Sequence, residues 1–100
     1  MACFTVVRVV LEDDVIIRKA RKNLGYPVRG VLLVDARAVE KARVALRVGA
    51  YATPLQVENA AARAVQAEAK ILTGIAQVKR INPRAVIRRV GNKVTVRVEV

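Results

Sequence analysis

Histidine and serine do not occur in this chain, and cysteine occurs once, as Cys3. Without histidine and serine the chain cannot form a serine–histidine hydrolase triad, and it has no imidazole for general acid–base chemistry. One cysteine without histidine leaves no ligand cluster for zinc and no partner for an internal disulfide. In its apolar surroundings Cys3 is expected to be a small, inert hydrophobe. We therefore predict a non-enzymatic protein with no catalytic residues, no metal, no cofactor and no small-molecule substrate.

Aromatic residues are also scarce: the chain has no Trp, and Phe4, Tyr26 and Tyr51 are its only aromatics. Only Tyr26 lies among basic residues, so a platform that stacks single-stranded bases is poorly supported. No apolar run approaches the roughly 18 residues that a membrane helix needs. The N-terminus also lacks the basic region and apolar stretch of a secretory signal. These features predict a cytoplasmic protein without a membrane partner.

Acidic residues are few, because eight Asp and Glu stand against nineteen Lys and Arg. The formal net charge is +11 and the isoelectric point is near 11.1. Such an imbalance destabilises a compact chain by self-repulsion, which a polyanion would relieve. Arginine outnumbers lysine, thirteen to six, which favours bidentate contacts with phosphates. The alternatives are a solvated basic surface that serves solubility and, less favoured, an anionic membrane surface.

The basic residues concentrate in two stretches. Residues 15–34 contain five and no acid, for a charge of +5, and residues 74–100 contain seven against Glu99, for +6. We predict that these residues bind nucleic acid, with 18–22 and the pair at 88–89 as the main contacts. For any single one of them, the alternative is a solvated strand edge that discourages aggregation. The predicted binding residues are Arg18, Lys19, Arg21, Lys22, Arg29, Lys79, Arg80, Arg84, Arg88, Arg89, Lys93 and Arg97.

The first third of the chain has the composition of strands. Residues 3–11 and 15–20 are rich in β-branched side chains and flank the acidic residues 12–14, a pattern that predicts a β-hairpin with a solvated tip. Residues 23–27 have the Gly and Pro of a turn. The apolar residues 31–34 are consistent with a short buried strand.

Two helices follow. Asp35 is placed to cap a helix over residues 36–46, which Gly49 would end. A second helix is better marked: Thr53 and Gln56 form a capping-box pattern around a proline at the first helical position. We expect this helix to reach residue 72 and to stop at Gly74. Its charges cancel, so we predict that it packs against a sheet and does not contact the ligand. Its expected inner face is Leu55, Ala62, Val65, Ala69 and Leu72.

The chain closes with a second hairpin signal. Residues 85–90 and 93–100 flank Gly91-Asn92, and a Gly at the first turn position is typical of a type II′ turn. Residues 75–81 fit either a short helix or a strand. Together these elements predict one α+β domain over residues 1–100, a mostly antiparallel sheet of about five strands with two helices packed on one face. If both hairpins share that sheet, their basic residues would line one surface.

Three features resemble an archaeal family known as domain of unknown function 424. An opening strand passes an acidic turn into a second strand ending at Leu24-Gly25, a central helix leads to Gly74, and a closing strand follows Asn82-Pro83. The chain is more basic than that family and lacks its usual polar pattern near the final strand. The family occurs among archaeal translation genes, so the resemblance implies a ribosome-associated role.

Charge and resemblance together predict an archaeal ribosomal or ribosome-associated protein. It would bind RNA, foremost ribosomal RNA, through phosphate contacts, with other ribosomal proteins as further partners. One alternative is an architectural protein on duplex DNA, since the charged α and β pattern resembles the chromatin protein Alba, although Alba's Gly-Lys and Ala-Arg-Gly motifs are missing. Another is a regulatory subunit, since residues 51–78 resemble the small tRNA-binding subunit of the KEOPS tRNA-modification complex.

Overall fold

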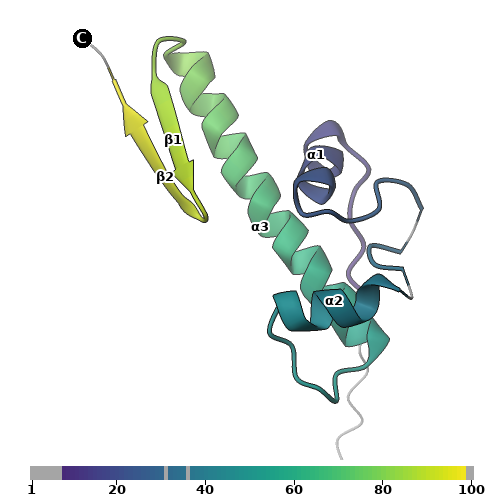
Figure 1. Ribbon diagram of the computed structural model, residues 1–100. Coiled ribbons are helices and arrows are strands. Elements are labelled where there is room, and N and C mark those ends of the chain that lie inside the picture. Colours follow the sequence, from purple (N-terminus) through teal and green to yellow (C-terminus); the bar gives the residue numbers. More distant parts are fainter. Residues whose placement is uncertain (1–7, 31, 36, 99–100) are drawn as a thin grey trace, which may run out of the picture.

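The computed structural model describes residues 8–30, 32–35 and 37–98, which form three helices and one two-stranded antiparallel sheet (Figure 1). The fold is α+β, but the predicted sheet of about five strands covered by two helices is wrong. The elements in chain order are α1 (Val15–Asn23), α2 (Ala38–Ala45), α3 (Pro54–Ile81), β1 (Val86–Val90) and β2 (Lys93–Arg97).

Helix α1 occupies the place of the predicted second strand. The Asp14 carboxylate accepts a 2.7 Å hydrogen bond from the Ile17 amide and so caps the helix. Ile17 and Ala20, three residues apart, both pack into the core, and Ala20 is fully buried. An N-cap hydrogen bond and a helical apolar spacing here outweigh the strand preference of β-branched side chains, which depends strongly on context.

The predicted first strand, residues 3–11, is only partly described, since residues 3–7 lie outside the described residues. Residues 8–11 form no strand. The Val9 amide donates a 2.8 Å hydrogen bond to the side-chain oxygen of Asn59 on α3. This segment therefore lies along a helix, and the predicted first hairpin is wrong where the structure describes it.

The predicted turn at residues 23–27 is confirmed and ends α1. Gly25 has φ +76°, and the Tyr26 amide reaches back to the Arg21 carbonyl at 2.9 Å, as in a Schellman motif. Leu33 and Val34 of the predicted short strand are buried as expected, but they form no strand.

Helix α2 begins at Ala38, two residues after the expected start, and ends one residue before the expected end near Leu46. The Asp35 carboxylate accepts a 2.7 Å hydrogen bond from the Ala38 amide. The helix ends at Ala45, and Arg47 follows with φ +54°, in the left-handed region that a glycine would favour. The expected stop at Gly49 therefore lies beyond the actual end.

The capping box of α3 is confirmed, but its predicted end is wrong. Thr53 Oγ1 accepts from the Gln56 amide at 3.2 Å, and the Gln56 side chain accepts from the Thr53 amide at 2.9 Å. The helix continues through Gly74 for 28 residues, about 42 Å at 1.5 Å per residue. A glycine inside a helix costs only about 1 kcal/mol, whereas Pro83 cannot continue it.

The core lies on the N-terminal part of α3, where α1 and α2 pack against it (Figure 1). Its small side chains let the helix axes approach closely. Residues 54–72 thus pack on other helices, which corrects the predicted packing on a sheet. The buried core residues are Ala20, Leu33, Val34, Ala42, Val57, Ala61, Ala62, Val65 and Ala69.

The closing hairpin is confirmed. Val90 pairs with Lys93 across Gly91-Asn92, and Gly91 has the positive φ, +59°, of the first position in a type II′ turn. The hairpin runs beside the C-terminal part of α3 (Figure 1). The resulting shape is elongated, 60 × 30 × 24 Å with a radius of gyration of 16.4 Å, against about 13 Å for a compact chain of this length.

Candidate nucleic-acid interface

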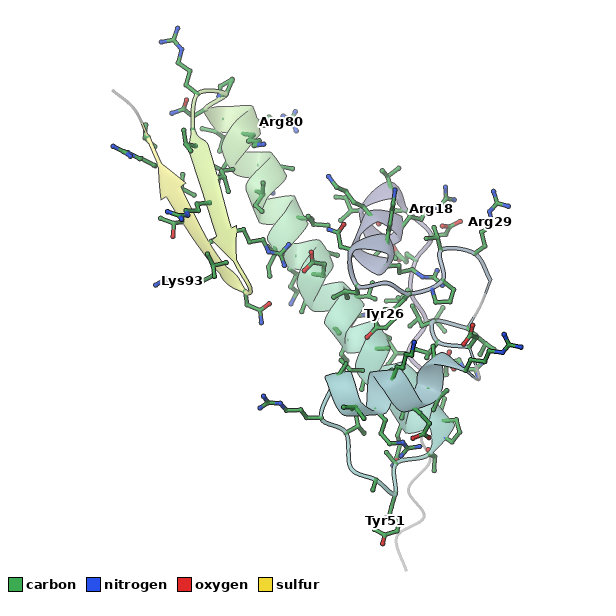
Figure 2. All side chains as sticks on the ribbon, in the orientation of Figure 1. Arg18, Tyr26, Arg29, Tyr51, Arg80 and Lys93 are labelled. Atoms are coloured by element: carbon green, nitrogen blue, oxygen red, sulfur yellow. The ribbon has the colours of Figure 1, made fainter. Side chains whose placement is uncertain are left out.

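The twelve predicted binding residues fall into two separate groups, one beside the middle of α3 and one at the end of α3 and on the hairpin. Figure 2 shows Arg18 and Arg29 on one flank and Lys93 on the other. The single basic surface expected from two hairpins in one sheet is therefore absent from the described residues. The first group, on α1 and the loop after it, is Arg18, Lys19, Arg21, Lys22 and Arg29. The second, at the end of α3 and on the hairpin, is Lys79, Arg80, Arg84, Arg88, Arg89, Lys93 and Arg97.

One face of the hairpin is basic, and we call it the hairpin basic face. Residues directly opposite in an antiparallel pair point to the same side, and alternate pairs share that side. The pairs Val86↔Arg97, Arg88↔Thr95 and Val90↔Lys93 thus share one face. Its three cations, Arg88, Lys93 and Arg97, are exposed and form no hydrogen bond or ion pair with any described residue.

Arg89 points to the other face of the hairpin and is already paired. Its Nη1 donates to Glu68 Oε1 of α3 at 2.6 Å, and its Nη2 donates to Oε2 of the same carboxylate. Asn23 at the end of α1 also donates to Glu68 Oε1, at 3.3 Å. Glu68 is buried, with 6% of its surface exposed. Arg89 therefore fixes the hairpin to α3 and is not free for a phosphate.

The Glu68 carboxyl is held in its ionised form. Hydrogen bonding from Arg89 lowers its pKa, with a smaller contribution from Asn23, and together they outweigh burial, which acts to raise it. From the sequence, Glu68 was expected to be one of the charges that cancel within its own helix. Strand alternation across the hairpin offered a signal for this inward position. Arg89 shares its face with the apolar Val94 and Val96 of the second strand, whereas Arg88 shares its face with Lys93, Thr95 and Arg97.

The end of α3 extends the basic region beyond the hairpin. Lys79 and Arg80 lie in the last turn of α3, where cations interact favourably with the helix dipole. Arg84 lies in the turn before β1, and its amide donates to the Asn82 side chain at 3.1 Å. All three side chains are exposed, and residues 69–98 contain no acidic residue. This part of the molecule therefore presents an unopposed positive charge.

On the other flank, two of the five cations are engaged. Arg18 Nε and Nη2 donate to the two oxygens of Asp13 at 2.7 and 2.8 Å. This pair lowers the pKa of Asp13 and raises that of Arg18. Arg21 is buried, with 8% exposed. Lys19, Lys22 and Arg29 are exposed without a partner among the described residues.

The two described aromatics do not form a stacking platform. Tyr26 is partly buried against the core, and burial raises the pKa of its hydroxyl. Tyr51 is fully exposed, in the loop before α3. Figure 2 shows the two side chains well apart, with Tyr51 at the far end of the molecule from Arg80.

Two of the three acidic residues at 12–14 have structural roles. Asp13 pairs with Arg18, and Asp14 caps α1, so they are not the tip of a hairpin. Within the described ranges, no three His, Cys, Asp or Glu side chains gather as metal ligands would. No helix in that part of the chain is both long and apolar enough to cross a membrane.

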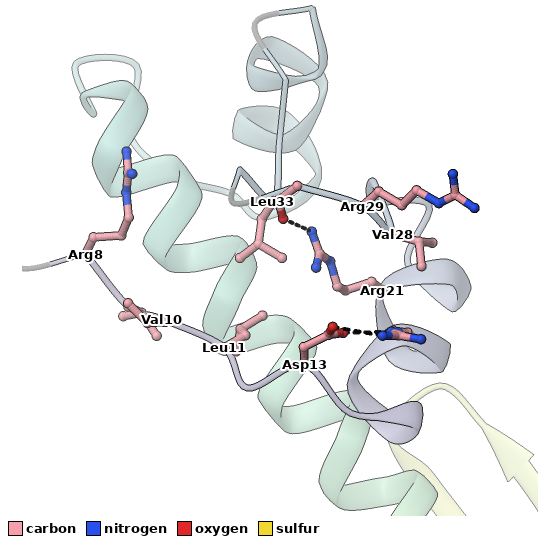
Figure 3. A pocket seen from close by; sticks show the side chains of 11 residues that line it. Arg8, Val10, Leu11, Asp13, Arg21, Val28, Arg29 and Leu33 are labelled. Atoms are coloured by element: carbon pink, nitrogen blue, oxygen red, sulfur yellow. Dashed lines mark hydrogen bonds and ion pairs between the residues drawn. The ribbon is translucent and has the colours of Figure 1, made fainter.

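A groove of about 610 Å³ lies between residues 8–13, α1, residues 28–30 and Leu33 (Figure 3). Four arginines and a single acid, Asp13, line it, and its other lining residues are apolar or glycine. Figure 3 shows Arg21 near its centre, with Arg8 and Arg29 at its two sides. Sequence reasoning did not predict this groove, because Arg8 lies in a segment expected to be a strand.

Comparison with protein-family models, curated proteins and solved structures finds no match to the chain. The resemblance to domain of unknown function 424 therefore stays a prediction, neither supported nor contradicted.

Proposed function

We propose that this chain is a cytoplasmic, non-enzymatic RNA-binding protein that holds RNA phosphates on its hairpin basic face. The observation that carries the proposal is the placement of Arg88, Lys93 and Arg97 on one side of the hairpin. All three are exposed, have no described partner, and share their face with no acid among the residues that the structure describes. Lys79, Arg80 and Arg84 extend the positive charge along the end of α3.

The chemistry of this face favours contact with the nucleic-acid backbone over reading of bases. It has guanidinium and ammonium donors and the Thr95 hydroxyl, which suit phosphates and the ribose 2′-hydroxyl. It has no aromatic ring on which a base could stack. Val86 and Val90, exposed by 51% and 69%, lie between the cations. A mixed basic and apolar face of this kind suits a folded ribosomal RNA with neighbouring ribosomal proteins.

Duplex DNA is the second candidate, favoured by the shape of the hairpin. The major groove of B-form DNA admits a two-stranded β-ribbon, whereas that of A-form RNA is too deep and narrow for side chains to read. The face with Arg88, Lys93 and Arg97 is the outward side of such a ribbon. This candidate corresponds to an architectural DNA-binding protein.

A filter-binding titration against salt tests the proposal. We expect the logarithm of the affinity for ribosomal RNA to fall linearly with the logarithm of the salt concentration. Replacing Arg88, Lys93 and Arg97 by Ala should make the slope shallower by about 2 to 3 units, from roughly 0.7 to 0.9 per lost phosphate contact. Tighter binding to a DNA duplex than to RNA at equal salt would favour the second candidate.

A charge-matched variant separates the face from bulk charge. Arg37, Lys41 and Arg63 are exposed cations without a described partner, away from the hairpin. Replacing these three by Ala lowers the net charge by the same amount and should leave the slope nearly unchanged. Equal losses in the two triple variants would mean that no defined face binds RNA. A slope near zero in the unmodified chain would remove nucleic acid as a ligand.

A further inference from the structure

The groove on the other flank of α3 contains a buried cation that forms no ion pair with any described residue. The Asp13 carboxylate, which pairs with Arg18, interacts with this cation only over a longer distance. Arg21 is only 8% exposed. Its Nη2 donates to the carbonyls of Gly30 and Leu32, but at 3.5 and 3.4 Å, the long end of the hydrogen-bond range. Its Nε is buried and makes no hydrogen bond with any residue that the structure describes. Because a buried charge is costly without a partner, this guanidinium is poised to accept an anion.

The residues around Arg21 add charge of the same sign. Arg29 is exposed and unpaired within the described residues, so its side chain is free to turn toward the groove. Arg8 contacts Glu58 through Nε, at 3.4 Å. Arg18 donates through Nε and Nη2 to Asp13, the single acid of the lining, so the Nη1 of Arg18 stays available to a ligand. Four arginines and one aspartate give the lining a charge of +3.

The charge and size of the groove indicate the class of ligand. A phosphomonoester carries a charge of about −1.5 to −2 at neutral pH, with three acceptor oxygens that match the planar donor pairs of guanidinium groups. The volume, about 610 Å³, exceeds the needs of a bare phosphate and lies within the range of small-molecule sites. Apolar walls from Leu11, Val28 and Leu33 offer contact surface for an organic group attached to the phosphate (Figure 3).

We infer that this groove binds a phosphomonoester. The buried Arg21 guanidinium would bind the phosphate group, and the exposed Arg29 side chain would turn toward it and bind it from the solvent side. The group belongs to a nucleoside monophosphate or to the phosphorylated end of a nucleic-acid strand. In both ligands a phosphate dianion is attached to a ribose that carries a base. The site lies on the flank of α3 opposite the hairpin basic face, so it does not depend on the proposed RNA binding (Figure 2).

Isothermal titration calorimetry with the full chain tests the site. The probes are adenosine 5′-monophosphate, adenosine, inorganic phosphate, and an oligonucleotide with and without a 5′-phosphate. We expect adenosine monophosphate to bind at least tenfold more tightly than adenosine. A preference for the phosphorylated oligonucleotide over the mononucleotide would assign the site to strand ends, and equal affinity for inorganic phosphate would assign it to the free anion. Equal binding of adenosine and its monophosphate, or no binding of any probe, would overturn the inference.

Two substitutions and one control locate the site. Arg29→Ala removes an exposed side chain without a described partner, so the chain should stay folded while its affinity for adenosine monophosphate falls at least fivefold. Arg37→Ala, an exposed arginine outside the groove, should change nothing. Arg21→Met keeps the apolar stem and should abolish the preference for the phosphorylated ligand.

These variants also separate the groove from the hairpin. The Arg88, Lys93 and Arg97 triple variant should bind adenosine monophosphate normally, and Arg29→Ala should keep the salt slope for ribosomal RNA within one unit. If Arg29→Ala binds the monophosphate as tightly as the unmodified chain does, the groove is not the site.

Discussion

The two ends of α3 differ in what covers them. Between Val57 and Ala69 the helix buries an apolar stripe under α1 and α2, and Val57 and Val65 have no exposed surface. At the other end Ile81 is 85% exposed, and Val90 of the neighbouring hairpin is 69% exposed. The covered part is stabilised by packing, whereas the uncovered part depends on helix continuity and a two-stranded hairpin, which is marginal on its own.

The unpaired cations at this uncovered end connect its exposure with its proposed role. Elements that bind ligands come from the less stable parts of a fold, because a surface that packs internally is not free for a partner. Glu68 marks the border between the two parts. Its carboxylate accepts from Asn23 of α1 and from Arg89 of β1, so one buried acid ties the hairpin to the packed part.

The sharpest contrast is expected between a covered and an uncovered valine. Val65→Asp places a carboxylate at a fully buried position and should lower the free energy of unfolding by about 3 to 5 kcal/mol or prevent folding. Val44→Asp makes the same change on α2 at a site that is 78% exposed and should cost less than about 0.5 kcal/mol. Urea unfolding followed by circular dichroism measures both. Similar losses at the two sites would contradict the assigned core.

The neighbours Arg88 and Arg89 are expected to differ almost as clearly. Arg89→Ala leaves the buried Glu68 carboxylate with only Asn23 as a donor and should cost about 1.5 to 3 kcal/mol, the range for hydrogen bonds to charged groups. Arg88→Ala removes an exposed, unpaired side chain and should cost less than about 0.5 kcal/mol. Amide hydrogen exchange of β1 and β2 is the measurement, since Arg89→Ala should speed exchange there. Equal protection in the two variants would mean that Glu68 does not hold the hairpin.

The elements predicted correctly from the sequence are those with local signals. The Thr53–Gln56 capping box, the cap at Asp35 and the Gly91-Asn92 turn each depend on neighbouring residues, and each is present. The predicted strand at residues 15–20 was wrong because its β-branched side chains were given more weight than Asp14, a residue type that commonly caps helices. The stop at Gly74 failed because a glycine is tolerated within a helix that other turns support.

The arrangement of the basic residues could be predicted only in part. Strand alternation is enough to place Arg88, Lys93 and Arg97 on one face once the hairpin is known. The pairing of Arg89 with Glu68 and the burial of Arg21 depend on contacts between elements far apart in the chain. No local pattern encodes such contacts, so the sequence placed Arg21 and Arg89 among the main expected contacts although both are engaged within the fold.

Low pH should weaken the interaction between Arg89 and Glu68 that holds the hairpin to α3. In the folded chain the pKa of Glu68 is lowered from its ordinary value of 4.5. The stabilisation from the ionised Glu68 carboxylate is therefore complete above pH 4.5 and is lost as the pH falls through the lowered pKa of the folded chain. We expect faster exchange of hairpin amides, relative to those of α3, as the pH drops from 5 to about 3. Glu68→Gln has no titrating carboxyl and should show no such change. An identical pH dependence in both chains would assign it to other acids, such as Asp13.

The smallest expected effect lies in the covered part, at the end of α2. Arg47 has φ +54° at the position where a Schellman motif usually has glycine, and its amide donates to the Val44 carbonyl at 3.2 Å. Glycine would relieve a backbone cost of roughly 1 to 2 kcal/mol, but it also gives the unfolded chain about 0.4 to 1 kcal/mol more conformational freedom. Arg47→Gly should therefore raise the free energy of unfolding by about 0.5 kcal/mol. Arg37→Gly removes the same charge at a position where φ is −80°. It should lower stability, because glycine makes the unfolded chain more flexible there and relieves no backbone strain in the folded chain. If both glycines destabilise the chain equally in urea unfolding, the left-handed geometry at Arg47 carries no strain.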